Sequence, residues 1–252
     1  MIGLDSSRVV ITGAGGGVGT ALVERFAELG ATVVACDLPG SDLGDLPVAE
    51  THLFDLTDRE ATLQAAQEIC ERGEPDCLVS NAGWTRAETF DQATHQAIEF
   101  EVGLNFSGAA DLSRALLPAM RNRPNGASFV FISSINAISH FGNPAYAAAK
   151  AGLGAWARAI AAEEGVNGIR ANVVAPGSIR TPAWDHRIER DPEILKRVSA
   201  FFPLGRMVEA REVANAAAFL ASPLASGITG VTLPVDCGLS SSYLPFMREI
   251  AS

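Results

Sequence analysis

The stretch "VVITGAGGGVGTAL", residues 9–22, decides the fold that the sequence predicts. It starts as an apolar β-branched run, passes through five glycines in the seven residues 13–19, and continues as a helical pattern. Glycines let a backbone approach a phosphate group closely, and the helix that starts near Val18 offers free N–H groups and the positive end of a dipole. A glycine turn alone would also fit an ordinary tight turn. Between a strand and a helix, it indicates a dinucleotide-binding unit.

An acidic residue follows at the distance that such a unit requires. The next strand-like run, "VVACD", ends in Asp37, about twenty residues beyond the loop. A carboxylate there can accept hydrogen bonds from both ribose hydroxyls of an adenosine and would repel a 2′-phosphate. No Arg or Lys lies in the loop or directly after Asp37 to bind that phosphate. These residues predict NAD, rather than NADP, as the cofactor.

The rest of the chain continues the same alternation of strands and helices. The predicted strands are 8–12, 32–36, 51–54, 76–80, 128–133, 169–175 and 230–235. Their interiors are apolar without clean alternation, as in parallel strands that are covered on both faces. Helical patterns such as 18–29 and 211–221 lie between them. We therefore expect one α/β domain over 1–252, with 182–208 as a substrate-binding lid because this stretch interrupts the alternation.

Composition narrows the range of partners. The chain has 252 residues, a formal net charge of −10 and no basic block, so we expect it to bind neither nucleic acid nor an anionic membrane. No run of eighteen apolar residues is present, and the N-terminus shows no signal-peptide layout. Four cysteines without a CxxC pair predict reduced thiols in a cytoplasmic protein. The four histidines are scattered, so no metal site is expected.

Two polar strand ends should share one rim of the sheet with the glycine loop. Asp55 follows the third predicted strand and could accept from an adenine amino group, although it could also cap a helix that starts near Thr57. Asn81 and Gly83 follow the fourth strand. Ligands of open α/β sheets bind at the carboxyl ends of the strands, so we expect these residues to line one crevice.

A tyrosine and a lysine stand four residues apart in "NPAYAAAKAGL", residues 143–153. Asn143 and Pro144 suit a helix start, as N-cap and first-turn residue, so Tyr146 and Lys150 should share one helix face. An ammonium nearby would lower the pKa of the phenol and let it exchange a proton with an alcohol or ketone. Ser133 and Ser134 end the preceding strand and could hydrogen-bond the reacting oxygen. By spacing alone, a Tyr and a Lys four apart on a helix are more often a solvated surface pair.

Several motifs together distinguish these possibilities. "TGAGGGVG" (12–19), "SNAG" (80–83), the serine-bearing strand end, "YAAAK" (146–150) and "APGSIRTP" (175–182) occur in order over nearly the whole chain. Their combination resembles the short-chain dehydrogenase/reductase family. The resemblance implies a Rossmann-type doubly wound parallel sheet of order 3-2-1-4-5-6-7. It also implies a homotetramer, and the small-residue helix 145–161 would suit packing between subunits.

The resemblance also implies a role for each matching residue. Tyr146 would be the general acid/base, Lys150 would lower its pKa and bind the nicotinamide ribose, and Ser134 would orient the substrate oxygen. Ser133 stays as an alternative, because the interval from Ser134 to Tyr146 is one residue shorter than in many members. Asn105 would hold a water of a proton relay. The implied cofactor-binding residues are Gly13, Gly17, Val18, Gly19, Asp37, Asp55, Leu56, Asn81, Gly83, Tyr146, Lys150, Pro176, Gly177, Ile179 and Thr181.

The chain departs from the family pattern at a few positions. Ser80 replaces a frequent Asn, Gly103 lies inside a helix, and Cys237 stands where Gly is usual. None of these changes removes a catalytic group. The tail after Gly238 is longer than usual. The resemblance implies that this end lies at a subunit interface, as in tetrameric relatives, within reach of a neighbouring pocket.

The predicted function is hydride transfer between NAD(H) and a secondary alcohol or ketone. Polar and aromatic residues near the predicted site favour a small polar substrate such as a polyol, a sugar or a hydroxy acid, although the aromatic ones could simply pack the lid. These candidates are Trp84, Arg86, Asn136, His140, Phe141, Trp184, His186, Phe201 and Phe202. His140 is also compatible with a plain loop residue. The alternatives are a 3-oxoacyl-[acyl-carrier-protein] reductase and a non-catalytic regulator that senses dinucleotides.

Overall fold

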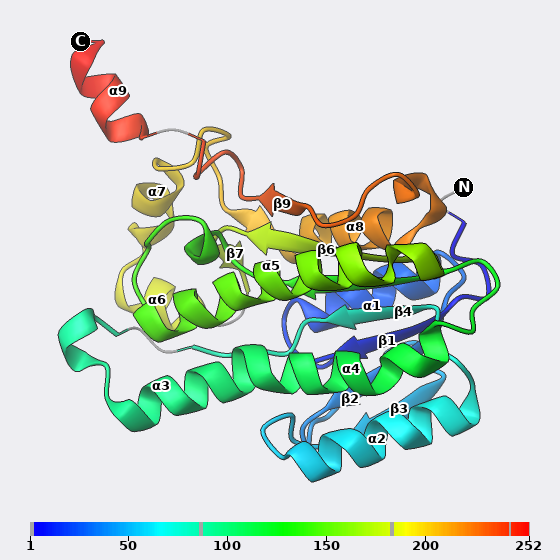
Figure 1. The fold of residues 1–252 in the computed structure, drawn as a ribbon. Coiled ribbons are helices and arrows are strands. Elements are labelled where there is room, and N and C mark those ends of the chain that lie inside the picture. Colours follow the sequence, from blue (N-terminus) through cyan, green and yellow to red (C-terminus); the bar gives the residue numbers. More distant parts are fainter. Residues whose placement is uncertain (1–2, 86–87, 182–183, 242, 252) are drawn as a thin grey trace.

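A seven-stranded parallel sheet forms the centre of the molecule (Figure 1). The computed structural model describes residues 3–85, 88–181, 184–241 and 243–251. The strand order is β3-β2-β1-β4-β5-β6-β9. The strands are β1 (Arg8–Thr12), β2 (Thr32–Asp37), β3 (Glu50–Leu53), β4 (Cys77–Ser80), β5 (Ala127–Ile132), β6 (Ile169–Pro176) and β9 (Thr232–Val235). This confirms the α/β class and the order predicted from the sequence.

Two short strands outside this sheet were not predicted. β7 (Ile179–Arg180) and β8 (Val208–Glu209) form a separate parallel pair, in which Ile179 lies opposite Val208. The last strand of the main sheet is therefore the ninth along the chain. Strands of two residues leave no periodic signal in the sequence, which is why the pattern did not reveal them.

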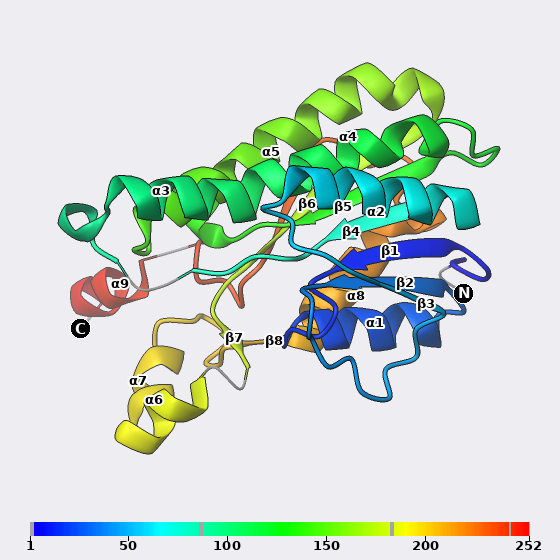
Figure 2. The same cartoon turned by 90° about the horizontal axis from the view of Figure 1, so that it is seen from below.

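Helices cover both faces of the sheet, as Figure 2 shows. α1 (Gly19–Glu28) and α8 (Ala210–Ala221) pack together over one face. α2 (Arg59–Arg72), α4 (Gly108–Met120) and α5 (Pro144–Glu164) cover the other. Each face of the sheet has its own hydrophobic core: the first core lies under α1 and α8, and the second lies under α2, α4 and α5. Side chains alternate along each strand, so Val9 and Ile11 belong to the first core and Val10 belongs to the second. Burial on both faces accounts for the continuous apolar runs in the strands.

α3 (His95–Val102) leads to α4 through a π-helical turn, Gly103–Ser107. Gly103 was recognised from the sequence as an unusual residue inside a helix. A π-helical turn inserts an extra residue into the helix and changes the direction in which the following side chains point. Asn105 lies within this turn.

The segment predicted as a lid, 182–208, contains two short helices, α6 (Asp185–Arg190) and α7 (Ile194–Ser199). Both views place them away from the sheet and its covering helices (Figures 1 and 2). The C-terminal helix α9 (Leu244–Ile250) extends from the body on the same side in Figure 1. The role of the lid, and the single-domain description that includes it, stay predictions.

The four cysteines all lie within the residues that the structure describes. Cys36 and Cys77 are buried, Cys70 and Cys237 are half-buried, and all four are free thiols. Among the residues that the structure describes, no helix has the length and apolar character needed to cross a membrane.

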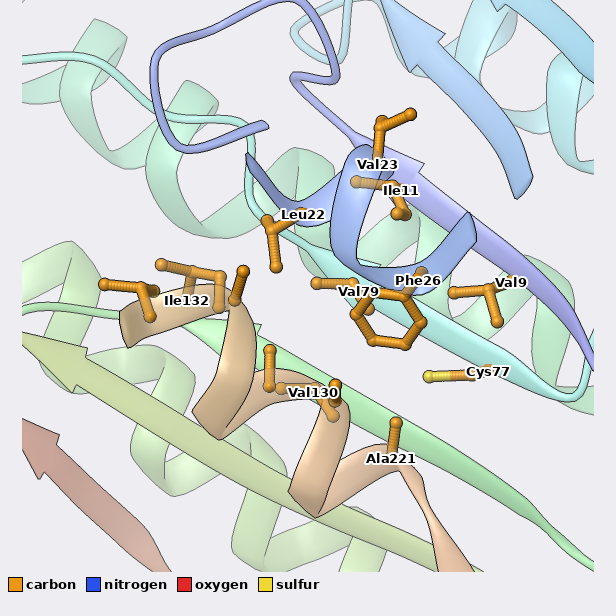
Figure 3. Packing of buried hydrophobic residues seen from close by; sticks show 14 of the residues in the cluster. Val9, Ile11, Leu22, Val23, Phe26, Cys77, Val79, Val130, Ile132 and Ala221 are labelled. Carbon is orange, nitrogen blue, oxygen red and sulfur yellow. The ribbon is translucent and has the colours of Figure 1, made fainter. Parts of the chain in front are cut away.

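Phe26 of α1 is the largest side chain at the centre of the first core (Figure 3). It has no solvent exposure and lies among Val9, Cys77, Val79 and Val130 in the picture. Its ring therefore ties α1 to three neighbouring strands, β1, β4 and β5.

Replacing this ring should leave a cavity that the surrounding strands cannot fill. We expect Phe26→Ala to lower the free energy of unfolding by about 3–5 kcal/mol, measured by urea denaturation. Phe90→Ala is the matched control, because Phe90 is 86% exposed and its loss should change stability by less than about 0.5 kcal/mol. Equal losses in the two variants would contradict the assignment of Phe26 to the core.

Candidate active site

A cavity of about 900 Å³ opens at the carboxyl ends of the strands, where ligands of such sheets bind. Its volume is in the usual range for a cofactor or substrate site. Fourteen residues that were predicted from the sequence line it: Gly13, Gly17, Val18, Asp37, Leu56, Asn81, Gly83, Ser134, Tyr146, Lys150, Pro176, Gly177, Ile179 and Thr181. The fold thus brings together residues from most of the chain length.

The glycine loop packs so tightly that side chains would disrupt it. A Cβ atom on Gly19 would lie 1.8 Å from the carbonyl oxygen of Gly13, and one on Gly13 would lie 2.9 Å from Cα of Ala82. Gly13 also has φ of +65°, which favours glycine. Gly19 therefore does not line the cavity itself but shapes the loop that does.

The start of α1 can receive an anionic group. Its N-cap residue, Val18, makes no side-chain hydrogen bond to the first turn, and the N–H of Thr20 donates to the carbonyl of Gly16 at 2.9 Å, so an anion would have to bind N–H groups of this turn other than that of Thr20. A glycine-lined cavity wall and an uncapped helix N-terminus fit the pyrophosphate of a dinucleotide.

Asp37 ends β2 beside this loop. Its carboxylate accepts hydrogen bonds from the backbone N–H of Gly15 at 2.7 Å, from that of Leu38 at 2.7 Å and from the hydroxyl of Ser41 at 2.8 Å. The bond to Gly15 fixes the carboxylate against the loop, at the cavity wall. An acceptor held in this way fits the ribose of an adenine dinucleotide.

Tyr146 and Lys150 lie one turn apart on α5, and both line the cavity. Lys150 is only 3% exposed and its Nζ donates to the carbonyl of Ile132 at 2.9 Å. The same nitrogen lies 5.7 Å from the centre of the Tyr146 ring. The solvated surface pair that spacing alone allowed is therefore wrong.

The expected lowering of the Tyr146 pKa is not found. Burial raises the pKa of Tyr146 to about 12, although its hydrogen bond with the Ser134 hydroxyl acts in the opposite direction. Burial also lowers the pKa of Lys150 to about 8, and the charge of Glu101 opposes that effect. Desolvation dominates both groups because the cavity wall removes them from water.

The two serines at the end of β5 have different partners. The Ser133 hydroxyl is buried and donates to the backbone carbonyl of Lys150 at 2.8 Å, so it supports α5. Ser134 instead bonds with the Tyr146 phenol and also accepts from the N–H of Asn136. Of the two candidates, the geometry favours Ser134 as the serine that accompanies Tyr146.

The start of α5 differs from the expected cap. Asn143 adopts a left-handed conformation, with φ of +53°, and its side chain makes no cap hydrogen bond to α5. Its Oδ1 accepts instead from the N–H of Glu88, while its own N–H donates to the carbonyl of Glu88. Asn143 therefore occupies the N-cap position, as predicted, but the expected cap hydrogen bond is wrong: its side chain joins α5 to the segment that follows β4. Pro144 does occupy the first turn, as predicted.

Asn105 lies behind the cavity wall and is 1% exposed. Its Nδ2 donates to the carbonyl of Trp84 at 2.9 Å, and its Oδ1 accepts from the N–H of the same residue at 3.2 Å. The side chain thus holds the backbone of Trp84, which lines the cavity. The predicted role of Asn105 in a water relay stays a prediction.

Asp55 and Asn81 both organise turns beside the site. Asp55 is not part of the lining; its carboxylate accepts from the N–H and the hydroxyl of Thr57, each at 2.8 Å. The helix that Asp55 could have capped starts at Arg59 and is capped by Asp58. Asn81 donates from Nδ2 to the carbonyls of Thr12 and Gly13, joining β4 to the glycine loop.

Of the residues suggested for substrate selection, Trp84 is the one that lines the cavity as described. Its ring is half exposed and meets Phe100 edge to face, with the ring centres 6.0 Å apart. The other candidates lie elsewhere: Phe202 is buried beside Gly177, while His140 and Phe141 are exposed. Trp184 stacks with Arg187. Arg86 and the side chain of His186 lie outside the described residues.

Two features of the site escaped sequence reasoning. Thr12 receives hydrogen bonds from the N–H groups of Asn81 and Ala82 and thereby holds the turn after β4. Glu101 is 3% exposed and binds both Asn105 and Thr85. A charged residue in a helical pattern predicts a surface position, so nothing in the sequence separated Glu101 from its exposed neighbours. No group of metal-ligating side chains occurs within the described part of the chain.

Comparisons with known proteins agree with this geometry. A family model described as enoyl-(acyl carrier protein) reductase matches residues 13–240. A 3-oxoacyl-[acyl-carrier-protein] reductase of Thermotoga maritima is 33% identical over 249 residues, which cover 94% of this chain and 98% of that protein. The L-fucose dehydrogenase of Bos taurus is 34% identical over 249 residues, which cover 93% and 90% of the two chains.

A solved structure shares the whole fold. It is the crystal structure of an oxidoreductase of the short-chain dehydrogenase/reductase family from Burkholderia thailandensis, with 36% identity and a TM-score of 0.89. The match covers 98% of this chain and 97% of that one.

The contact between Gly19 and Gly13 gives a direct test of the loop. A methyl group at position 19 would strike the backbone, so Gly19→Ala should displace the loop and lower the free energy of unfolding by about 1–3 kcal/mol. We expect NADH binding, followed by nicotinamide fluorescence, to weaken about tenfold or more. Gly227→Ala, where no atom lies within 4 Å of the added group, is the control and should retain both properties.

Proposed function

The chain belongs to the short-chain dehydrogenase/reductase family of oxidoreductases, and from that membership we propose that it transfers a hydride between NAD(H) and a secondary alcohol or ketone. The observation that carries the proposal is the cluster of Ser134, Tyr146 and Lys150 at the wall of the same cavity as the glycine loop. A nicotinamide cofactor supplies the hydride acceptor or donor. The protein supplies its orientation and a route for the proton.

Each side chain has a distinct part in the proton step. Ser134 donates to the substrate oxygen and orients it toward Tyr146. As an alcohol loses hydride from its carbon, the Tyr146 oxygen accepts the hydroxyl proton; in ketone reduction it returns that proton. Lys150, as an ammonium, favours the phenolate form of Tyr146 and binds the nicotinamide ribose. Because burial raises the pKa of Tyr146 to about 12, this stabilisation is needed for the phenol to act as a base near neutral pH.

The preference for NAD rests on Asp37. Its carboxylate is held against the loop by the N–H of Gly15 and presents a negative charge where a 2′-phosphate would lie. Near this carboxylate, the described lining of the cavity contains neither Arg nor Lys. The Asp37 carboxylate would therefore both accept hydrogen bonds from the ribose hydroxyls of NAD and repel the 2′-phosphate of NADP.

A small polar substrate suits the part of the cavity wall that Trp84 and Thr85 form, in the cavity that Tyr146 also lines. Trp84 offers a flat, half-exposed ring, and Thr85 lies beside it with a hydroxyl. An aromatic ring with adjacent polar groups suits a sugar or another polyol, which has both C–H faces and hydroxyls. The similarity to L-fucose dehydrogenase supports the same substrate class.

Reduction of a 3-oxoacyl group on a carrier protein is the second candidate, favoured by the similarity to the Thermotoga maritima reductase and by the matching family model. Carrier proteins are acidic, so the net charge of −10 would oppose docking. Assays of sugars, polyols and hydroxy acids against 3-oxoacyl thioesters, each with NAD(H) and NADP(H), separate the two functions. NADH binding without turnover of any of these would favour the dinucleotide-sensing regulator. The homotetramer and the cytoplasmic location stay predictions.

Tyr146→Phe tests the proton step. We expect kcat to fall by about 10²- to 10⁴-fold, because the ring remains while the acid/base group is lost. NADH binding should persist. Tyr243→Phe is the matched control: the chain contains two tyrosines, and Tyr243 is 72% exposed in the C-terminal tail. A Tyr146→Phe enzyme with near-normal turnover would disprove the assigned role.

Asp37→Asn tests cofactor choice. Loss of the negative charge should lower the ratio of kcat/KM for NAD to that for NADP about tenfold, a change of ~1.4 kcal/mol in relative transition-state binding. Asp45→Asn makes the same change of charge at an exposed position in the loop after β2 and should leave the ratio unaltered. A ratio that is unchanged in Asp37→Asn would remove the basis for NAD preference.

A further inference from the structure

Glu101 is a carboxylate placed where the packing of a helix would ordinarily require an apolar side chain. It lies near the end of α3, is 3% exposed, and belongs to a helix that packs against α5 (Figure 1). Burying a carboxylate costs several kcal/mol unless hydrogen bonds and nearby charges offset the lost hydration. The hydrogen bonds and charged neighbours of the Glu101 carboxylate therefore indicate which role it has in the site.

The first contact is with Asn105, one turn along the chain. The Nδ2 of Asn105 donates to Oε2 of Glu101 at 2.9 Å and to the carbonyl of Glu101 at 3.0 Å. These bonds fix which end of the amide faces Glu101 and leave Oδ1 to accept from the N–H of Trp84. The π-helical turn at 103–107 contains Asn105 and sets this geometry.

The second contact is with Thr85, whose hydroxyl donates to Oε1 of Glu101 at 3.0 Å. Trp84 is also held from the same helix, since its ring meets Phe100, the residue before Glu101. The wall formed by Trp84 and Thr85 is thus attached to the end of α3 by a direct bond, by a bond through Asn105 and by a ring contact.

The third relation is with the catalytic pair. A Cβ atom on Gly83 would lie 2.6 Å from Oδ1 of Asn105 and 3.0 Å from Nζ of Lys150, so the amide and the ammonium are neighbours across that glycine. The charge of Glu101 raises the pKa values of Lys150 and Tyr146. For Lys150 this opposes burial and favours the ammonium form.

Resting on the proposed function, we propose that Glu101 is a positioning residue of the proton-transfer site, holding Asn105 and Thr85 behind the catalytic pair and keeping Lys150 cationic. A purely structural role would be filled by an apolar residue at this depth. The arrangement instead places an anion behind the amide that borders Lys150, where it stabilises the form of Lys150 that the reaction uses.

The charged surroundings of Lys150 are simple within the described part of the chain. Tyr146 comes from its own helix and Glu101 from α3, whereas His95 and Glu99 of α3 pair with each other at the surface. β4, β5 and the π-helical turn contribute no charged residue.

The composition of the chain permits a measurement that needs no turnover. Lys150 and Lys196 are its two lysines, so a Lys196→Arg background with isotope-labelled lysine leaves one side-chain NMR signal, that of Lys150. We expect Glu101→Gln to lower the midpoint of the Lys150 titration, from about 8, by about one pH unit. Glu99→Gln removes the same charge from the exposed side of α3 and should leave the midpoint unchanged.

A midpoint that does not move in Glu101→Gln, or moves equally in Glu99→Gln, would overturn the electrostatic part of the proposal. The titration reports on Lys150 whether or not a substrate is found, so its failure is distinct from failure of the proposed function.

A second experiment tests whether the hydrogen bond between Thr85 and Glu101 holds the cavity wall in place. It also tests the positioning role of Glu101 if Glu101→Gln fails to fold. Thr85→Val removes the hydroxyl that binds Glu101, and Thr85→Ser keeps it. With a substrate identified, we expect KM to rise about 3- to 10-fold in Thr85→Val with little change in kcat, and to return toward the wild-type value in Thr85→Ser. Equal KM values in the two variants would contradict the positioning role.

Discussion

The close contact between Gly19 and the carbonyl of Gly13 is the constraint on which the site depends. It brings the first turn of α1 onto the end of β1, so the helix N-terminus faces the cavity. Asn81 and Thr12 then connect this turn to the end of β4. The glycine-lined wall and the wall that carries Trp84 are consequently connected through the ends of β1 and β4.

Burial governs the chemistry of the opposite wall. Tyr146 and Lys150 are removed from water, and each is pushed toward its neutral form. The hydrogen bond with Ser134 opposes the effect of burial on the pKa of Tyr146, and the charge of Glu101 opposes it for Lys150, whereas for Tyr146 the charge of Glu101 acts in the same direction as burial. The pKa values of Tyr146 and Lys150 are set by desolvation together with a few local charges and hydrogen bonds, and not by the interaction of these two residues alone.

Features with a sequence period or a fixed motif could be predicted. The glycine loop, Asp37 at the rim and the Tyr146–Lys150 pair on one helix face all have this character, because each follows from local spacing, whereas the order of the sheet was predicted from the family resemblance. The cap at Asn143, the partners of Asp55 and the burial of Glu101 do not, because they depend on which distant segment packs nearby. The expected fall in the pKa of Tyr146 is not found for the same reason: the burial of Tyr146 comes from the tertiary fold, and burial is the largest effect on its pKa.

The small parallel pair of β7 and β8 has a consequence for how such a protein can change. Ile179 lies opposite Val208, so the two ends of the intervening segment are fastened to one another by backbone pairing. The entropy needed to close a loop grows only slowly with its length. Residues can therefore be added or removed between these anchor points at small thermodynamic cost and without altering the register of the main sheet.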